Sequence, residues 1–144
     1  MLNISNFIAK YVTKRPESMF QADLYAHQSA LNESIEGKSV LVIGGAGSIG
    51  SSYIKALLPF KPKTLVVVDI SENGLTELTR ELRSTSAFTV PTDYVTYPMN
   101  YADDTFVKMF KDRGGFDIVA NFSAHKHVRS EKDKYSVEAL LKNN

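Results

Sequence analysis

The sequence predicts an α/β fold in which a parallel sheet of about four strands carries helices on both faces. Two observations predict this fold. Short apolar runs rich in β-branched residues recur along the chain, as expected for strands that are buried on both faces. Segments with apolar residues at helical spacing lie between these runs, and such alternation implies parallel strands joined by crossover helices. We expect the strands at residues 39–43, 64–68, 94–98 and 116–120.

A helix is expected after each strand. The first covers residues 51–58, and the second follows an N-cap at Ser71 and places three leucines on one face. The third begins near Asp103 and ends at the pair Gly114-Gly115. A last helix is expected over residues 136–142.

Residues 1–37 are predicted to form a helical extension that precedes the domain at residues 38–144. Apolar residues at rough helical spacing indicate two amphipathic helices, one around residues 2–12 and one around residues 20–31. Such helices need a surface against which to bury their apolar faces. That surface could belong to the domain, to a partner subunit or to a further part of the protein. The extension is interpreted as a packing element, with a regulatory role as the alternative.

A glycine-rich turn, Gly44-Gly45-Ala46-Gly47-Ser48-Ile49-Gly50, joins the first strand to the first helix. In this context the first glycine permits a tight turn, the middle one lets the backbone approach a pyrophosphate, and the last lets the helix pack on the strand. The free N–H groups and the dipole of the helix start favour phosphate there. The sequence therefore predicts a Rossmann-like dinucleotide-binding fold.

Asp69 follows the second strand, about twenty residues beyond the glycines, where a carboxylate accepts hydrogen bonds from the adenosine ribose. A carboxylate at this position also repels a 2′-phosphate, and no arginine follows immediately. We therefore favour NAD over NADP as the cofactor and leave both open. The alternative role for Asp69 is a structural cap before the next helix.

Composition narrows the class of protein. The chain of 144 residues has room for one domain, and its formal net charge of +1 gives no general attraction to nucleic acid or to an anionic membrane. The absence of cysteine excludes disulfides, thiolate nucleophiles and cysteine-based metal sites. No apolar stretch approaches the length of a membrane span. We expect a cytoplasmic protein with no metal, nucleic-acid or membrane partner.

Three stretches carry a family resemblance. They are the segment around the glycine turn, the pair Val68-Asp69 with the helix after it, and the fourth strand running into Ala124-His125-Lys126-His127-Val128. Together they resemble the nucleotide-sugar 4,6-dehydratases of the extended short-chain dehydrogenase/reductase superfamily. The most similar group is the polysaccharide-biosynthesis type that acts on UDP-N-acetylglucosamine. The wider spacing Gly44-x-x-Gly47-x-x-Gly50 is typical of this superfamily.

The resemblance implies a reaction that uses a tightly held nicotinamide cofactor. Hydride leaves C4 of the sugar, a base removes the C5 proton, the C6 hydroxyl departs as water, and hydride returns to C6. The family's catalytic Tyr-x-x-x-Lys arrangement does not occur in this sequence. We therefore expect the chain to be the N-terminal portion of a longer enzyme that binds cofactor but does not catalyse alone. Its incomplete sheet should leave an apolar edge that is covered by self-association or by rearrangement, and we favour a homo-oligomer.

The sequence departs from the family pattern at three places, one of which is Ser52, where the family usually has glutamate. Met99-Asn100-Tyr101 stands where the family usually has Gly-Asp-Val, so Asn100 would replace a carboxylate near the adenine. Its side chain can accept one hydrogen bond and donate another. Phe122 stands in a run that is usually rich in alanine, where it would line or crowd the nicotinamide side. The residues expected to bind the cofactor are Gly44, Gly47, Ser48, Ile49, Gly50, Asp69, Asn100 and Tyr101.

No catalytic residue is expected within the chain, although Lys126 and His127 are candidates for supporting roles. They follow the fourth strand, at the sheet edge where ligands bind in open α/β folds. Lys126 could pair with a phosphate or a substrate hydroxyl, and His127 has a reference pKa suited to acid–base work. The alternative is that both are solvated in a surface loop. Two further functions stay open: a nucleotide-sugar epimerase or oxidoreductase, and a non-catalytic nucleotide-binding module.

Overall fold

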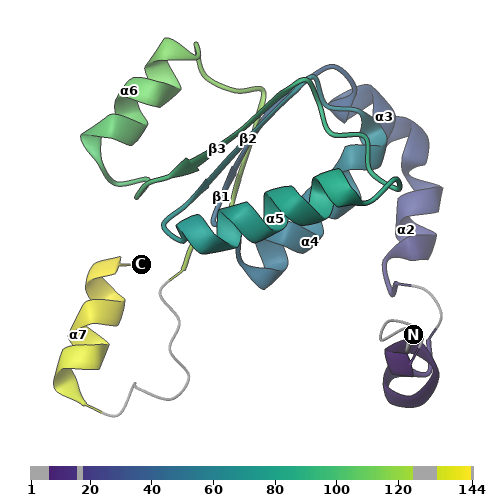
Figure 1. The fold of residues 1–144 in the computed structure, drawn as a ribbon, viewed down its shortest axis with the longest axis horizontal. Coiled ribbons are helices and arrows are strands. Elements are labelled where there is room, and N and C mark those ends of the chain that lie inside the picture. The colour runs from purple at the N-terminus through teal and green to yellow at the C-terminus, as the bar shows by residue number, and fades with distance from the viewer. Residues whose placement is uncertain (1–6, 16–17, 125–132, 144) are drawn as a thin grey trace. The chain divides into compact units, whose positions relative to one another are not determined.

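The structure is a computed structural model, and it describes residues 7–15, 18–124 and 133–143. The chain divides into two compact units, Met1–Ser34 and Ile35–Asn144 (Figure 1). The second unit contains the sheet and the glycine turn.

The first unit is helical. It contains a short π-helix, η1 (Ile8–Thr13), then α2 (Gln21–Ala26) and most of α3 (Gln28–Ile35). The second of the two predicted helices is divided, because the backbone leaves helical geometry at His27, with φ −107° and ψ 11°. The first, predicted around residues 2–12, can be followed from residue 7, where it forms η1 and extends to Thr13. Large apolar side chains of this unit are exposed, among them Tyr11, which is 61% exposed.

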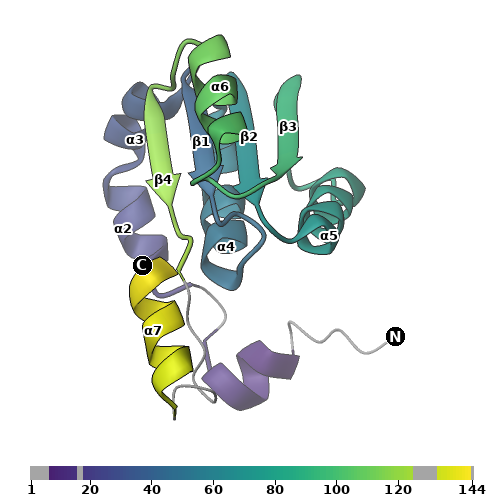
Figure 2. The same cartoon turned by 90° about the vertical axis from the view of Figure 1, so that its left-hand side faces the viewer.

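Four parallel strands form the sheet in the second unit, as predicted. They are β1 (Ser39–Ile43), β2 (Thr64–Asp69), β3 (Asp93–Pro98) and β4 (Ile118–Asn121). Their order across the sheet is β3-β2-β1-β4, and Figure 2 shows them side by side. In the register, Val40 of β1 lies between Leu65 of β2 and Ile118 of β4.

The helices follow the strands in the predicted order. They are α4 (Ser48–Leu57) with the 3₁₀ turn η2 (Leu58–Phe60), α5 (Glu72–Ser84), α6 (Asp104–Asp112) and α7 (Lys134–Asn143). α4 begins three residues before the predicted start at 51, because Gly47, with φ −71° and ψ 166°, is its N-cap. The predicted N-cap of α5 is confirmed, since the Ser71 hydroxyl accepts a hydrogen bond from the Gly74 N–H at 3.1 Å.

Helices cover both faces of the sheet because side chains alternate along each strand. Val40 and Val42 of β1 point to one face, where they pack in a buried cluster with leucines of α5 and with Ile54 of α4. Leu41 and Ile43 point to the other face and pack near Met109 of α6. In Figure 1 the sheet separates α6 from α4 and α5. The prediction of a layered α/β architecture is thus confirmed.

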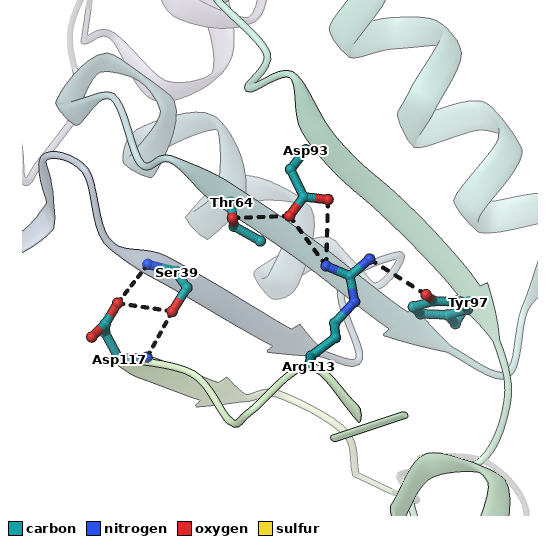
Figure 3. A network of polar contacts seen from close by, with 6 residues as sticks. All are labelled: Ser39, Thr64, Asp93, Tyr97, Arg113 and Asp117. Atoms are coloured by element: carbon teal, nitrogen blue, oxygen red, sulfur yellow. Dashed lines mark hydrogen bonds and ion pairs between the residues drawn. The ribbon is translucent and has the colours of Figure 1, made fainter. Parts of the chain in front are cut away.

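Paired side chains join the elements at the N-terminal ends of the strands, as Figure 3 shows. The Asp117 carboxylate accepts hydrogen bonds from the Ser39 N–H and hydroxyl, both at 2.8 Å. The Ser39 oxygen accepts the Asp117 N–H in return at 3.0 Å. These bonds fasten the start of β1 to the chain entering β4.

A second group of polar side chains lies beside the first. Arg113, at the C-cap of α6, reaches both carboxylate oxygens of Asp93 at 3.2 and 3.3 Å and the Tyr97 hydroxyl at 3.4 Å. The Thr64 hydroxyl donates to the same carboxylate at 3.0 Å. The hydrogen bond to Tyr97, supported by Asp93, raises the pKa of Arg113. The group therefore ties the end of α6 to β2 and β3.

Candidate functional site

A cavity of about 510 Å³ lies at the carboxyl ends of the strands, where ligands bind in open α/β sheets. The chain segments that follow all four strands contribute to its wall. Five of the eight residues that were expected to bind a cofactor line it: Gly44, Gly47, Asp69, Asn100 and Tyr101.

The glycine turn is packed closely on both sides. Gly44 has φ +73°, and a Cβ there would lie 2.6 Å from the backbone nitrogen of Ser123. A Cβ on Gly50 would meet the Gly44 carbonyl oxygen and would lie 2.7 Å from the Cα of Gly45. In contrast, a Cβ on Gly47 would have one neighbour, the Gly44 carbonyl oxygen at 3.4 Å. Gly44 and Gly50 are thus required by packing, whereas Gly47 keeps the turn bare beside the cavity.

The start of α4 presents backbone donors. The Ser51 N–H donates to the Gly47 carbonyl at 2.9 Å and closes the first turn. Within the described part of the chain, the N–H groups of Ser48, Ile49 and Gly50 have no hydrogen-bond acceptor. These residues do not line the cavity themselves, but they follow Gly47 directly. Unpaired amides and the positive end of the helix dipole make this a site suited to an anion.

Asp69 links the glycine turn to the turn after β2. One carboxylate oxygen accepts the Ala46 N–H at 2.9 Å, and the other accepts the Ser71 N–H at 3.0 Å. A carboxylate has about four acceptor positions, so about two remain for a ligand. The capping role and the proposed ribose-binding role of Asp69 are therefore compatible.

Asn100 and Tyr101 line the cavity from the segment after β3. The Asn100 side-chain oxygen accepts the Ala102 N–H at 3.0 Å, which shapes a local turn. The amide hydrogens and one lone pair of Asn100 remain for a ligand. Its acceptor capacity is thus partly used within the chain, a contact that the sequence did not indicate.

Phe122 extends the wall after β4. Its N–H donates to the Ile43 carbonyl at 2.8 Å, which continues the pairing of β4 with β1. Its ring packs against Tyr53 of α4, with the two ring centroids 5.1 Å apart, and against the apolar cluster on that face. Burial raises the pKa of Tyr53. Phe122 lines the cavity, and its ring is fixed by packing on α4.

Lys126 and His127 lie outside the described residues, as does His125. In the described ranges, no group of three or more histidine, aspartate or glutamate side chains is arranged to hold a metal ion. No helix in these ranges combines the length and apolar character needed to cross a membrane. Sequence reasoning missed Ser123, whose backbone approaches Gly44, and the Ala46 N–H that Asp69 holds. Neither contact leaves a signal in residue spacing.

Comparison with known proteins identifies the family. Residues 40–144 match the family model described as "Polysaccharide biosynthesis protein". The chain belongs to this family. It is 29% identical over 119 residues to the "Probable polysaccharide biosynthesis protein EpsC" of Bacillus subtilis, a match that covers 81% of this chain and 19% of EpsC. It is 55% identical over 47 residues to the "Uncharacterized membrane protein MJ1061" of Methanocaldococcus jannaschii, which covers 33% of this chain and 14% of MJ1061. The chain therefore spans less than a fifth of either relative.

Several solved structures share the fold of this chain. Pen from Bacillus thuringiensis superposes with a TM-score of 0.61 and 26% identity, over 76% of this chain and 32% of Pen. WbmF from Bordetella bronchiseptica, solved in complex with NADH, gives a TM-score of 0.53 and 22% identity, over 76% of this chain and 29% of WbmF. The predicted Rossmann-like fold is thereby confirmed.

Proposed function

We propose that the chain is the dinucleotide-binding part of an NAD(P)-dependent enzyme that modifies a nucleotide sugar for polysaccharide biosynthesis. The observation that carries this proposal is the cavity at the carboxyl ends of the strands. There the glycine turn, which has no side chain at Gly47, is followed by the unpaired first-turn amides of α4. Membership of the polysaccharide biosynthesis family supports a role in that pathway. The NADH complex of WbmF supports a nicotinamide dinucleotide as the cofactor.

The residues present fit a dinucleotide. The pyrophosphate would bind the unpaired amides of Ser48, Ile49 and Gly50, because Gly47 before them has no side chain to block its approach. The free lone pairs of Asp69 would accept the ribose hydroxyls, and Asn100 and Tyr101 would border the adenine. When bound, the nicotinamide supplies a hydride acceptor and donor. The carboxylate of Asp69, followed by residues 70–74 without lysine or arginine, favours NAD over NADP.

The finer proposal is a lyase, a 4,6-dehydratase acting on UDP-N-acetylglucosamine. Its support is the resemblance carried by the glycine turn, the end of β2 and the segment after β4. In this proposal Lys126 and His127 assist at the substrate side, and the catalytic tyrosine and lysine come from outside the present sequence. The chain alone then binds cofactor and leaves the sugar unchanged.

A cytoplasmic location and a homo-oligomer belong to the same proposal. The absence of cysteine suits a reducing compartment. Among the described strands β4 pairs only with β1, and Val119 of β4 is 49% exposed. Self-association would cover this edge.

The first test uses isothermal titration calorimetry to measure the binding of NAD⁺ and NADP⁺ to the wild-type chain and to the Gly47→Val variant. A valine side chain should block the approach of the pyrophosphate and lower affinity by about 100-fold, equivalent to about 2.7 kcal/mol, while the protein stays folded. NAD⁺ should bind more tightly than NADP⁺. Unchanged affinity in Gly47→Val would count against the site.

The second arm of the test uses the complete gene product with UDP-N-acetylglucosamine. A 4-keto-6-deoxy sugar nucleotide, identified by mass spectrometry and NMR, supports the dehydratase. A product inverted at one sugar carbon with no loss of water supports an epimerase instead. Dinucleotide binding without any change in the sugar supports a non-catalytic module.

A further inference from the structure

The first turn of α5 lies against the glycine turn. Gly74 is the third residue of α5, and a Cβ placed on it would lie 2.9 Å from the Cβ of Ala46. Two methyl carbons pack comfortably at about 3.5–4.0 Å. Gly74 therefore provides the space that the Ala46 methyl group occupies.

Ala46 is also held through its backbone N–H, again by the segment around the start of α5. The Ala46 N–H donates to the Asp69 carboxylate at 2.9 Å, while the other carboxylate oxygen of Asp69 accepts the Ser71 N–H. The Ser71 hydroxyl in turn accepts the Gly74 N–H at 3.1 Å. The segment from Asp69 to Gly74 thus contacts both the amide and the methyl group of Ala46.

Helix propensity does not explain a glycine here. Alanine is favoured over glycine inside a helix, and the backbone of Gly74 is helical, without a positive φ. An alanine at this position should stabilise α5 considered alone. If it instead disturbs the protein, the cause lies in what the new methyl group meets, namely Ala46 or the Ser71 hydroxyl at 3.0 Å.

We propose that Gly74 is a positioning residue for the phosphate-binding turn. By leaving room for Ala46, it sets the position of the Gly47 backbone and of the amides that follow. On the other side of the turn, Gly44 already lies close to the backbone of Ser123, so the turn has little room to shift in that direction. A methyl group on Gly74 would therefore displace the turn or α5 by about 1 Å to restore normal packing. The consequence for ligand binding rests on the proposed dinucleotide function.

The test is a double-mutant cycle of Gly74→Ala, Ala46→Gly and the variant with both changes. Isothermal titration calorimetry with NAD⁺ measures affinity, and ¹H–¹⁵N spectra of the unliganded proteins report the amides of residues 44–50. Gly74→Ala should weaken binding about tenfold and shift those amides. The double variant should bind within about twofold of Ala46→Gly, because the colliding methyl group is gone.

The proposal is overturned if Gly74→Ala keeps wild-type affinity and amide positions. It is also overturned if the double variant is as impaired as Gly74→Ala, because the Ser71 contact would then be responsible. A lower melting temperature with unchanged affinity indicates a purely structural glycine and likewise overturns it. Failure of the proposed function would give a different result, because the wild-type chain would then bind no dinucleotide. The amide shifts of Gly74→Ala and their reversal by Ala46→Gly would still support the positioning role.

Discussion

The two ends of the sheet use polar groups in opposite ways. At the N-terminal end, side chains satisfy one another: Ser39 with Asp117, and Asp93 with Arg113. At the C-terminal end, the backbone dominates, and amides at the start of α4 have no acceptor among the described residues. Satisfied groups contribute to stability, whereas unpaired donors beside a cavity are available to a ligand.

The difference is reflected in side-chain size. The stabilising end uses aspartate and arginine, whose reach allows contacts between distant elements. The end with the cavity uses glycines, because Gly44 and Gly50 lie too close to other backbone atoms to carry a side chain. We therefore expect substitutions at the two ends to affect different measurements.

The largest effect on stability is expected for Gly50→Ala. The added methyl group would meet backbone of Gly44 and Gly45, which cannot move aside as a flexible side chain could. Despite the better helix propensity of alanine, the free energy of unfolding should fall by about 3 kcal/mol, measured by urea denaturation. The matched control is Gly47→Ala, where the new methyl group has space and the loss should stay below about 1 kcal/mol. Equal stability of the two variants would refute this account of the turn.

An intermediate effect, on stability alone, is expected for Asp93→Ala at the other end. The change removes the acceptor of Arg113 and Thr64, and the Asp93 side chain is 46% exposed. The free energy of unfolding should fall by about 1–2 kcal/mol, because hydrogen bonds to a partly exposed ion pair contribute modestly. NAD⁺ affinity should not change. A parallel loss of affinity would mean that the two ends are coupled through the sheet.

The smallest effect is expected in the acid limb of stability for Asp117→Asn. Hydrogen bonds from the Ser39 backbone and then from its hydroxyl lower the pKa of Asp117. Because the pKa is lower in the folded state, the carboxylate stabilises the fold above its unfolded pKa of about 3.9, and this contribution is lost as pH falls through the folded-state pKa.

Unfolding midpoints of the wild type and Asp117→Asn should therefore converge as the pH falls below about 4. Asp133 serves as a comparison, since hydrogen bonds from Ser136 and Tyr135 also lower its pKa. Asp133→Asn should leave the part of the pH dependence due to Asp117 intact. Parallel curves for wild type and Asp117→Asn would contradict the assignment.

Local signals predicted much of the fold. The apolar runs located β1 and β2, and the Ser71 N-cap marked the start of α5 to the residue. The divided helix at His27 was not predicted, because helical spacing continues through it and no glycine or proline marks the break.

The candidate site was predicted in part. Residue spacing predicted that Gly44, Gly47 and Asp69 would lie at one site, because parallel strands place their carboxyl ends together. All three line the observed cavity. It did not indicate that Asp69 would hold Ala46, or that Ser123 would pass beside Gly44, since both contacts join residues far apart in the sequence. The pairing of Ser39 with Asp117, 78 positions apart, was hidden for the same reason.

The order of the strands has a consequence for folding kinetics. β1 lies between β2, which follows after a single helix, and β4, which returns only after two more helices and another strand. Closing the longer loop costs more chain entropy, so the docking of β4 is expected to be the slower event. Because the backbone of Ser123 follows β4 and closes the wall beside Gly44, the cavity is completed only with that event. A ligand that touches both sides would therefore slow the detachment of β4 and lengthen the lifetime of the native state.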